Sequence, residues 1–357
     1  MTSLYGRARA AIPGGSLTRS KTLFNRWASH AAGAVVWDTE GRSYIDTLCA
    51  LGAITLGYQQ PQSAAGGVYS FPHRLEVEAA EAVLASVAPW ATWVRFTKTG
   101  SESTHAAVCI AMATTGRRQV IAMQDAYHGW FSTWNDVVRV PYGSDPETWV
   151  AEDIALVCIE PSRYVPTSVE WLRAVQGWCQ RQGSLLAFDS MIFGGRWALG
   201  GASEYFGVQP DLETFGKALG GGSAVAFVVG TARTKPRADV ASGTFSGDTV
   251  GLQAVIDTLR VYRTQPVIDT LWARGRQLWA GLAAVIPSTL GTLEGSPVLM
   301  RVRWHDPAHR QPFTDRMLAL GVIWHPDAVM PMQAHSEAQI DQVIASAKDA
   351  GEGLCRR

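Results

Sequence analysis

The stretch LLAFDSMIFGGRWALGG covers residues 185–201, and GVQPDLETFGKALGGG follows at residues 207–222. The apolar run LLAF ends at the carboxylate of Asp189, and Lys217 stands after Gly216 and shortly before three consecutive glycines. Glycine permits the tight turns and close backbone approaches that loops around a ligand require. A buried strand that ends in a charged side chain is typical of an α/β sheet with a site at its carboxyl edge.

Short apolar runs alternate with helical patterns on both sides of this stretch. Strands are predicted at Thr92–Thr97, Gln119–Met123, Ala155–Glu160, Leu185–Asp189 and Ala224–Gly230, and helices at Glu102–Thr114 and Val169–Gln182. Repeated strand, helix, strand units indicate an α/β fold with a mostly parallel sheet that is covered on both faces. Polar residues at the strand ends are then expected in one crevice.

The two ends of the chain show other patterns. Strands are predicted at 34–48, with a turn at Thr39–Gly41, at 298–303 and at Ala319–Trp324. Helices are predicted after Asp248, at Val267–Val285 and at Ser336–Ala350. The sequence therefore predicts a large α/β domain at about 49–255. A smaller α+β domain would be built from residues 1–48 and 256–357.

The composition excludes several classes of protein. The chain has 357 residues with 31 basic and 31 acidic side chains, so its formal net charge is zero. A pI near 7.1 without a basic block argues against a dedicated nucleic-acid binder, while a modified nucleotide stays open as a substrate. Only 17% of the residues are charged, against roughly 25% in an average protein, which fits a protein that buries an oligomer interface.

The five cysteines form no CxxC pair and have no histidine at zinc spacing, so we expect free thiols and no metal site. No apolar run reaches the roughly 18 to 20 residues of a membrane helix. The start of the chain has no apolar core of a secretory signal. These features predict a cytoplasmic protein.

Residues Thr99-Gly100-Ser101-Glu102 follow a predicted strand and begin a predicted helix. Thr99 and Glu102 have the spacing of a capping box, and Gly100 allows a ligand to approach the backbone. The free N–H groups and partial positive charge of a helix start favour an anion such as phosphate. An ordinary capped helix explains the pattern equally well.

Three further features have both a functional and a structural explanation. Asp189 could pair with a cationic ligand group or cap the following turn. Lys217 could form a Schiff base if it is desolvated, although most lysines are solvated surface groups. Tyr127, in Tyr127-His128-Gly129, could stack on a planar ring or simply fill space in a loop.

Taken together, these features suit pyridoxal 5′-phosphate (PLP). The phosphate of this cofactor needs backbone donors, its ring needs an aromatic neighbour, its nitrogen needs an acid, and its aldehyde needs an amine. A nucleotide cofactor has less support, because neither GxGxxG nor GxxxxGK[ST] occurs in the chain.

The chain resembles the class III aminotransferases, which are PLP enzymes of fold type I, and within them the glutamate-1-semialdehyde 2,1-aminomutase branch. The motifs that carry this resemblance are AAIPGG (10–15), VVWDTEGRSYID (35–46), VRFTKTGSEST (94–104), DAYHG (125–129), IEP (159–161), residues 185–201, residues 207–222 and SGTFSGD (242–248). The resemblance implies a fold type I PLP-transferase with a large PLP-binding domain.

The resemblance also implies roles for single residues. Lys217 would hold PLP as a Schiff base and then move protons at the substrate carbon. Asp189 would pair with the pyridinium nitrogen, and Met191 would pack under the ring. The other expected cofactor contacts are Thr99, Gly100 and Ser101 at the phosphate, Tyr127 and His128 at the ring, and Thr244, which in this family reaches the PLP phosphate of the neighbouring subunit of a homodimer.

Several departures from the family pattern concern the substrate. Ser190 stands where the family usually has a glutamate after the aspartate, and the region at 58–75 is short. Residues 50–52 lack the aromatic residue of the aminomutase pocket, and residues 325–330 lack its expected acidic residue. Arg19 aligns across a gap with the arginine that binds the substrate carboxylate in that branch, and a surface arginine explains it equally well.

Three functions remain open at this point. The first is amino-group transfer between an amino donor and a carbonyl compound of a specialised biosynthetic or modification pathway. The second is decarboxylation, or another reaction at Cα, of a bulky nucleotide- or sugar-linked amino acid; an aminomutase is a further alternative. The third is a non-catalytic binding protein, which would be expected to lack Lys217 or Asp189, and both are present.

Overall fold

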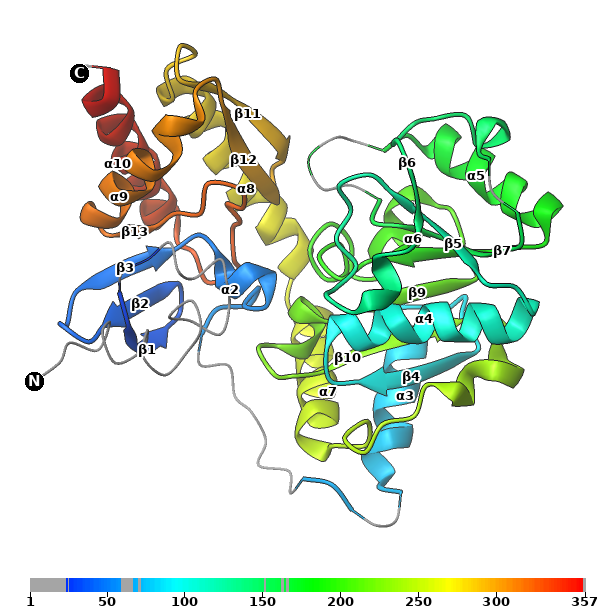
Figure 1. The fold of residues 1–357 in the computed structure, drawn as a ribbon. Coiled ribbons are helices and arrows are strands. Elements are labelled where there is room, and N and C mark those ends of the chain that lie inside the picture. Colours follow the sequence, from blue (N-terminus) through cyan, green and yellow to red (C-terminus); the bar gives the residue numbers. More distant parts are fainter. Residues whose placement is uncertain are drawn as a thin grey trace, which may run out of the picture.

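The computed structural model describes residues 24, 26–58, 67–69, 72–150, 152–161, 164 and 167–355. Two bodies of structure lie side by side, a large one around a long sheet and a smaller one that contains both ends of the described chain (Figure 1). None of the helices in these residues combines the length and the apolar character that a membrane crossing requires.

The large body is built on a seven-stranded sheet in the order β4-β10-β9-β8-β7-β5-β6. The strands are β4 (Trp93–Thr97), β5 (Gln119–Met123), β6 (Val138–Val140), β7 (Ile154–Ile159), β8 (Leu185–Asp189), β9 (Leu212–Phe215) and β10 (Ala226–Gly230). Only β10 runs against its neighbours, β4 and β9, and the remaining pairs of the sheet are parallel. The predicted mostly parallel α/β sheet is therefore confirmed.

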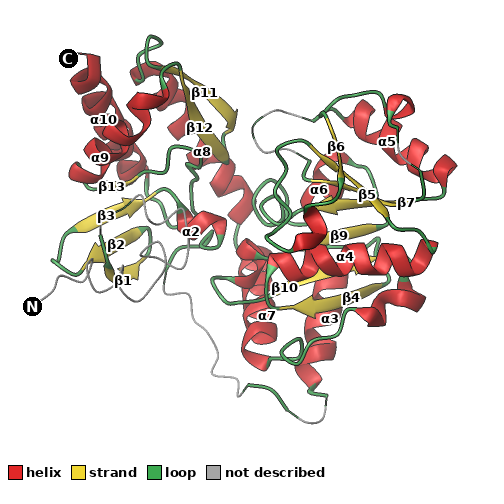
Figure 2. Cartoon of the chain, viewed as in Figure 1, coloured by secondary structure: helices red, strands yellow, loops and turns green. Residues whose placement is uncertain are grey.

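Helices cover both faces of this sheet (Figure 2). They are α3 (Arg74–Ser86), α4 (Gly100–Thr115), α5 (Val169–Gln182), α6 (Gly201–Phe206) and α7 (Thr249–Thr264). Val228 of β10 packs into the core that contains α4, while its neighbours Phe227 and Val229 pack into the core that contains α3 and α7. Because successive side chains of a strand point to opposite faces, these two cores lie on opposite sides of the sheet.

The smaller body joins sequence segments from both ends of the chain. Its strands are β1 (Ala28–Ala32), β2 (Val35–Asp38), β3 (Ser43–Asp46), β11 (Gly291–Ser296), β12 (Leu299–Trp304) and β13 (Val322–Ile323), and its helices are α8 (Val267–Val285), α9 (Arg310–Ala319) and α10 (Glu337–Cys355). β13 pairs with β3 in parallel, so both ends of the chain share one sheet. A separate apolar core contains Phe313, Trp324 and Ile340. The domain limits at 48/49 and 255/256 stay a prediction.

Short helical turns complete the structure. They are α2 (Cys49–Gly52) and the 3-10 helices η3 (Ser132–Trp134), η4 (Pro146–Thr148), η5 (Lys217–Gly220), η6 (Lys235–Val240) and η7 (Pro307–His309). Four cysteines have described side chains, and all four are free thiols: Cys49, Cys109, Cys158 and Cys179.

Candidate active site

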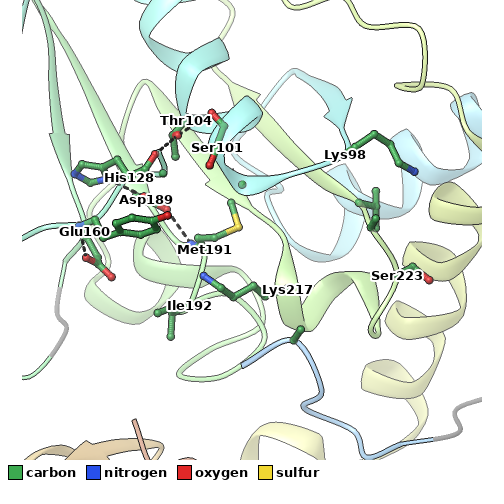
Figure 3. A pocket seen from close by; sticks show the side chains of 16 residues that line it. Lys98, Ser101, Thr104, His128, Glu160, Asp189, Met191, Ile192, Lys217 and Ser223 are labelled. Carbon is green, nitrogen blue, oxygen red and sulfur yellow. Dashed lines mark hydrogen bonds and ion pairs between the residues drawn. The ribbon is translucent and has the colours of Figure 1, made fainter. Parts of the chain in front are cut away.

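A cavity of about 310 Å³ opens where the loops after β4, β5, β7, β8 and β9 meet (Figure 3). Its walls come from six segments of the large body and from Ala53. The lining residues are Ala53, Lys98, Gly100, Ser101, Thr104, Tyr127, His128, Gly129, Glu160, Asp189, Met191, Ile192, Lys217, Ser223, Ala224 and Val225. This crevice lies where the sequence predicts polar strand ends to gather.

The start of α4 forms one wall of the cavity. Thr99 Oγ1 accepts a hydrogen bond from the Glu102 backbone at 3.2 Å, and Glu102 Oε2 accepts one from the Thr99 backbone at 2.9 Å. The predicted capping box is therefore present. The backbone N–H groups of Gly100 and Ser101, in the first turn, have no partner within the helix, as at every helix start, and both residues line the cavity.

A buried pair of charged groups, Asp189 and His128, also lines the cavity. Asp189 Oδ2 accepts a hydrogen bond from His128 Nδ1 at 2.7 Å, and Asp189 Oδ1 accepts from Met191 N at 3.1 Å and from Thr214 Oγ1 at 3.2 Å. Burial favours a raised pKa for Asp189, but the hydrogen bond and charge of His128, with the charge of Lys217, hold this pKa below its ordinary value. Asp189 is therefore ionised at neutral pH.

The environment of His128 favours the imidazolium form. Burial lowers the pKa of His128, whereas Cys158 and Asp189 raise it, and the net direction is upward. We ascribe this direction to Asp189, because burial raises the pKa of the Cys158 thiol and keeps it neutral. Among the described residues, the buried Nε2 atom of His128 has no hydrogen-bond partner.

Lys217 enters the cavity from a strained turn after β9. Its φ of +47° lies in the left-handed region, which costs a residue other than glycine roughly 1–2 kcal/mol. Such strain is typical of functional positions that the surrounding structure holds in place. In Figure 3 the Lys217 side chain reaches toward Met191 and Asp189, while the amine of Lys98 points the other way.

Met191 is wedged between two glycines of the cavity wall. A Cβ atom on Gly100 would come within 2.9 Å of Met191 Sδ, and one on Gly216 would come within 2.7 Å of the same atom. Both distances are shorter than normal van der Waals contacts. The two positions therefore require glycine because Met191 fills the space that a side chain would need.

The structure brings seven of the predicted site residues to one cavity: Gly100, Ser101, Tyr127, His128, Asp189, Met191 and Lys217. Two others do not line it. Thr99 caps α4 beside the cavity, and Thr244 lies exposed on the loop before α7. Arg19, the predicted substrate residue, lies outside the described residues.

The sequence reasoning assigned no role to two charged residues of the cavity. Glu160 directly follows β7, at the same edge of the sheet at which Asp189 ends β8, a signal that could have been used. It accepts a hydrogen bond from the Tyr127 backbone at 3.2 Å. Lys98 directly precedes the capping box and forms an ion pair with Asp248 at 2.6 Å. No pattern in the sequence connects Lys98 with Asp248.

A second carboxylate lies near Asp189, although Ser190 replaces the glutamate that the family pattern has at the next position. Glu213 of β9 is fully buried, and its Oε1 accepts a hydrogen bond from Ser190 Oγ at 2.5 Å and another from the Ala202 backbone at 3.0 Å. Burial raises the pKa of Glu213 to about 7. The glutamate of the family pattern is thus absent at position 190, and a carboxylate from the neighbouring strand β9 contacts Ser190 instead.

Comparison with known proteins identifies the family of the chain and its fold. The family model described as aminotransferase class-III matches residues 17–135 and 146–350. The chain belongs to the class III aminotransferases. Enzymes of this family use PLP, so this chain is a PLP-dependent enzyme of the transaminase type, as the sequence resemblance predicts.

Similar proteins support this assignment. A glutamate-1-semialdehyde 2,1-aminomutase of Natronomonas pharaonis is 32% identical over 335 residues, which cover 80% of this chain and 74% of the relative. An aminopentol aminotransferase of Sphingopyxis macrogoltabida is 32% identical over 320 residues, covering 79% and 75%. The solved structure of the FumI protein of Sphingopyxis sp. MTA144, in its PLP internal aldimine form, matches with a TM-score of 0.90 and 27% identity over 99% of this chain and 96% of that chain. The predicted fold type I architecture is therefore confirmed.

Proposed function

We propose that this class III aminotransferase moves an amino group between an amino donor and a carbonyl compound of a specialised biosynthetic or modification pathway, with PLP bound covalently to Lys217. One observation carries the proposal. Lys217, the ionised Asp189–His128 pair and the start of α4 line the same cavity. An amine, a buried acid and an anion-binding helix start are the three groups that this cofactor needs.

The residues of the cavity fit PLP. The N–H groups of Gly100 and Ser101, with Thr99 as the helix cap, would hold the phosphate. Tyr127 and Met191 would enclose the ring. Buried polar atoms normally have a hydrogen-bond partner. The buried Nε2 atom of His128 has none among the described residues, which fits a bound polar group next to His128.

The charges of the site explain what the chain itself contributes. When bound, PLP withdraws electrons from the substrate carbon that carries the amino group. His128 keeps Asp189 ionised, so Asp189 can hold a proton on the ring nitrogen. The amine of Lys217, once released, takes a proton from one carbon atom and returns it to another.

An aminomutase is the second candidate, because relatives named glutamate-1-semialdehyde 2,1-aminomutase are 30–32% identical to the chain. An aminomutase and an aminotransferase would share every role assigned above. They differ in whether the amino group returns to the same substrate skeleton or leaves on a product. We further propose a homodimer in which Thr244 contacts the cofactor phosphate of the neighbouring subunit; its exposed position is compatible with such a contact. A cytoplasmic location stays a prediction.

The cofactor linkage is tested with the two lysines of the cavity. The holoenzyme is reduced with borohydride, digested and mapped by mass spectrometry. We expect the cofactor on the peptide with Lys217, no adduct in Lys217→Ala, and an unchanged adduct in Lys98→Ala, which removes the other lysine of the same cavity. An adduct that persists in Lys217→Ala would contradict the assignment.

The reaction type is tested by product analysis with a panel of amino donors. Conversion of the enzyme to its pyridoxamine form, with release of a carbonyl product, supports amino-group transfer. Recovery of an isomer of the substrate would instead show an aminomutase. Release of carbon dioxide, with the cofactor still on Lys217, would show a decarboxylase and overturn the proposal.

A further inference from the structure

A second cavity, of about 160 Å³, lies in the small body beside β12 and α9. Its lining residues are Arg301, Val302, Arg303, Trp304, Pro307, Arg310 and Asp327, and we call it the arginine cavity. Three guanidinium groups thus surround a space of the size of a small ligand, in a chain whose net charge is zero.

The ion pairs of the arginine cavity leave an excess of positive charge. Arg301 and Arg303 share Glu294: Arg301 Nη2 lies 2.9 Å from Oε2, and Arg303 Nε lies 2.9 Å from Oε1. Arg310 forms an ion pair with Asp327. Three cations therefore face two carboxylates, which leaves a net charge of +1. Each guanidinium has five N–H donors, and these pairs occupy only some of them.

The orientation of Arg301 is fixed from outside the small body. Its guanidinium lies 4.0 Å from the centre of the Tyr164 ring, a cation–π distance. The hydroxyl of Tyr164 donates a hydrogen bond to the backbone carbonyl of Asp327. A guanidinium held in one plane loses less conformational entropy when it binds a planar or tetrahedral oxyanion.

Two short chain segments connect the surroundings of the arginine cavity with those of the candidate active site. Tyr164 comes four residues after Glu160, which lines the PLP cavity. Met300, the residue before Arg301, pairs with Val329 through backbone hydrogen bonds of 3.0 and 2.8 Å. The next residue, Met330, and Lys217 both lie against Gly52. A Cβ atom built on Gly52 would lie 3.5 Å from Met330 Sδ and 3.9 Å from Lys217 Cδ.

We propose that the arginine cavity binds a multiply charged oxyanion, either a phosphoryl group or a polycarboxylate. An arginine guanidinium binds carboxylate and phosphate through two parallel hydrogen bonds. An anion with several charged oxygen groups can therefore contact all three guanidinium groups at once, whereas Glu294 contacts only Arg301 and Arg303, and Asp327 contacts Arg310. Trp304 and Pro307 add an apolar wall that suits the body of an organic anion. This site is additional to the proposed amino-transfer reaction and does not depend on it.

Binding is tested by calorimetry on the holoenzyme, in which PLP already fills the catalytic cavity. The probes are inorganic pyrophosphate and citrate at constant ionic strength, because exposed charges are screened by salt. We expect at least one probe to bind. Arg303→Gln and Arg301→Gln should each lower the affinity for that probe by about tenfold or more, because each variant loses a charge-assisted hydrogen bond. A preference for pyrophosphate identifies a phosphoryl ligand, and a preference for citrate identifies a polycarboxylate.

Arg260→Gln is the matched control. Arg260 lies on α7 and pairs with Asp257 at 2.8 Å, so this variant removes one ion-paired surface arginine outside the arginine cavity. The control should bind the probe like the unchanged enzyme. Absence of binding for both probes, or equal weakening by Arg260→Gln and Arg303→Gln, would overturn the proposal. Arg303 is the most exposed of the three arginines, so its variant should fold normally.

Discussion

Replacement of Gly100 by alanine should weaken PLP binding through Met191. The new methyl group would lie 2.9, 3.0 and 3.1 Å from the Sδ, Cε and Cγ atoms of Met191. The backbone of Gly100 does not have a positive φ, so alanine itself causes no strain in the first turn of α4. The cost therefore comes from the displaced methionine, which must move toward the space that the cofactor ring needs.

Overpacking of this kind typically costs about 1–3 kcal/mol. If the displaced Met191 side chain competes with the ring, this range corresponds to a loss of roughly fivefold to 150-fold in cofactor affinity. Titration of the apoenzyme with PLP, followed by absorbance, measures the effect. The thermal unfolding midpoint of the apoenzyme separates a loss of affinity from a general loss of stability.

The double variant Gly100→Ala with Met191→Ala decides the mechanism. In the Met191→Ala background the clash is absent, so the Gly100→Ala change should reduce the affinity less than about threefold, within the usual scatter of independent effects. Equal losses in both backgrounds would refute the reasoning. Such a result would mean that the methyl group blocks the cofactor phosphate directly at the start of α4.

Three further variants test the electrostatics of the site. His128→Phe removes the hydrogen bond to the ionised Asp189, which should cost about 1.5–3 kcal/mol of stability at pH 7. His128 lowers the pKa of Asp189 in the folded chain, and this stabilisation is lost as the pH falls; without His128 burial raises that pKa, so unfolding midpoints of the variant should fall less on acidification than those of the unchanged protein. Glu213→Gln should gain stability relative to the unchanged protein as the pH rises from 5 to 8. The folded pKa of Glu213 is raised to about 7, so between its ordinary pKa and pH 7 only the unfolded carboxyl ionises and the unchanged protein loses stability; unfolding midpoints at pH 5 and pH 8 measure the difference. Thr244→Val should reduce PLP affinity in the dimer by roughly fivefold, as the loss of one hydrogen bond implies, and an unchanged titration would contradict the predicted contact.

The strands of the large body could be predicted where most of their residues are apolar, as in β5, β7, β8 and β10. β5 and β8 and helix α5 have the predicted bounds, and β4, β7 and β10 differ from the prediction by one or two residues. β9 was missed, because two of its four residues, Glu213 and Thr214, are polar, and their burial depends on partners in β8 and α6. The reversed direction of β10 also leaves no mark in a run of apolar residues.

Residues at or just after strand ends could be placed at the candidate site from the sequence, whereas residues that act through long-range contacts could not. Asp189 and Lys217 were recognisable, since a carboxylate after an apolar run and a lysine among glycines stand out in the sequence. The ion pair of Lys98 with Asp248 joins residues 150 positions apart and could not be found from spacing. The arginine cavity likewise depends on Tyr164, Glu294 and Asp327, which come from three separate segments.

The register between β8 and β9 explains why Lys217 meets Asp189. Asp189, the last residue of β8, pairs with Thr214 of β9. Lys217 comes three residues after Thr214, so it lies just beyond the edge of the sheet at which Asp189 ends β8. Adjacent residues of a strand point to opposite faces of the sheet. On each face, a side chain of β9 forms a hydrogen bond with Asp189 at the end of β8 or with the next residue, Ser190. Thr214 bonds to Asp189 on one face, and Glu213 bonds to Ser190 on the other. A shift of one residue would exchange these faces and leave both buried groups without their partners. The hydrogen bonds of the buried Glu213 therefore favour this register of β9, the strand that leads into the turn with Lys217.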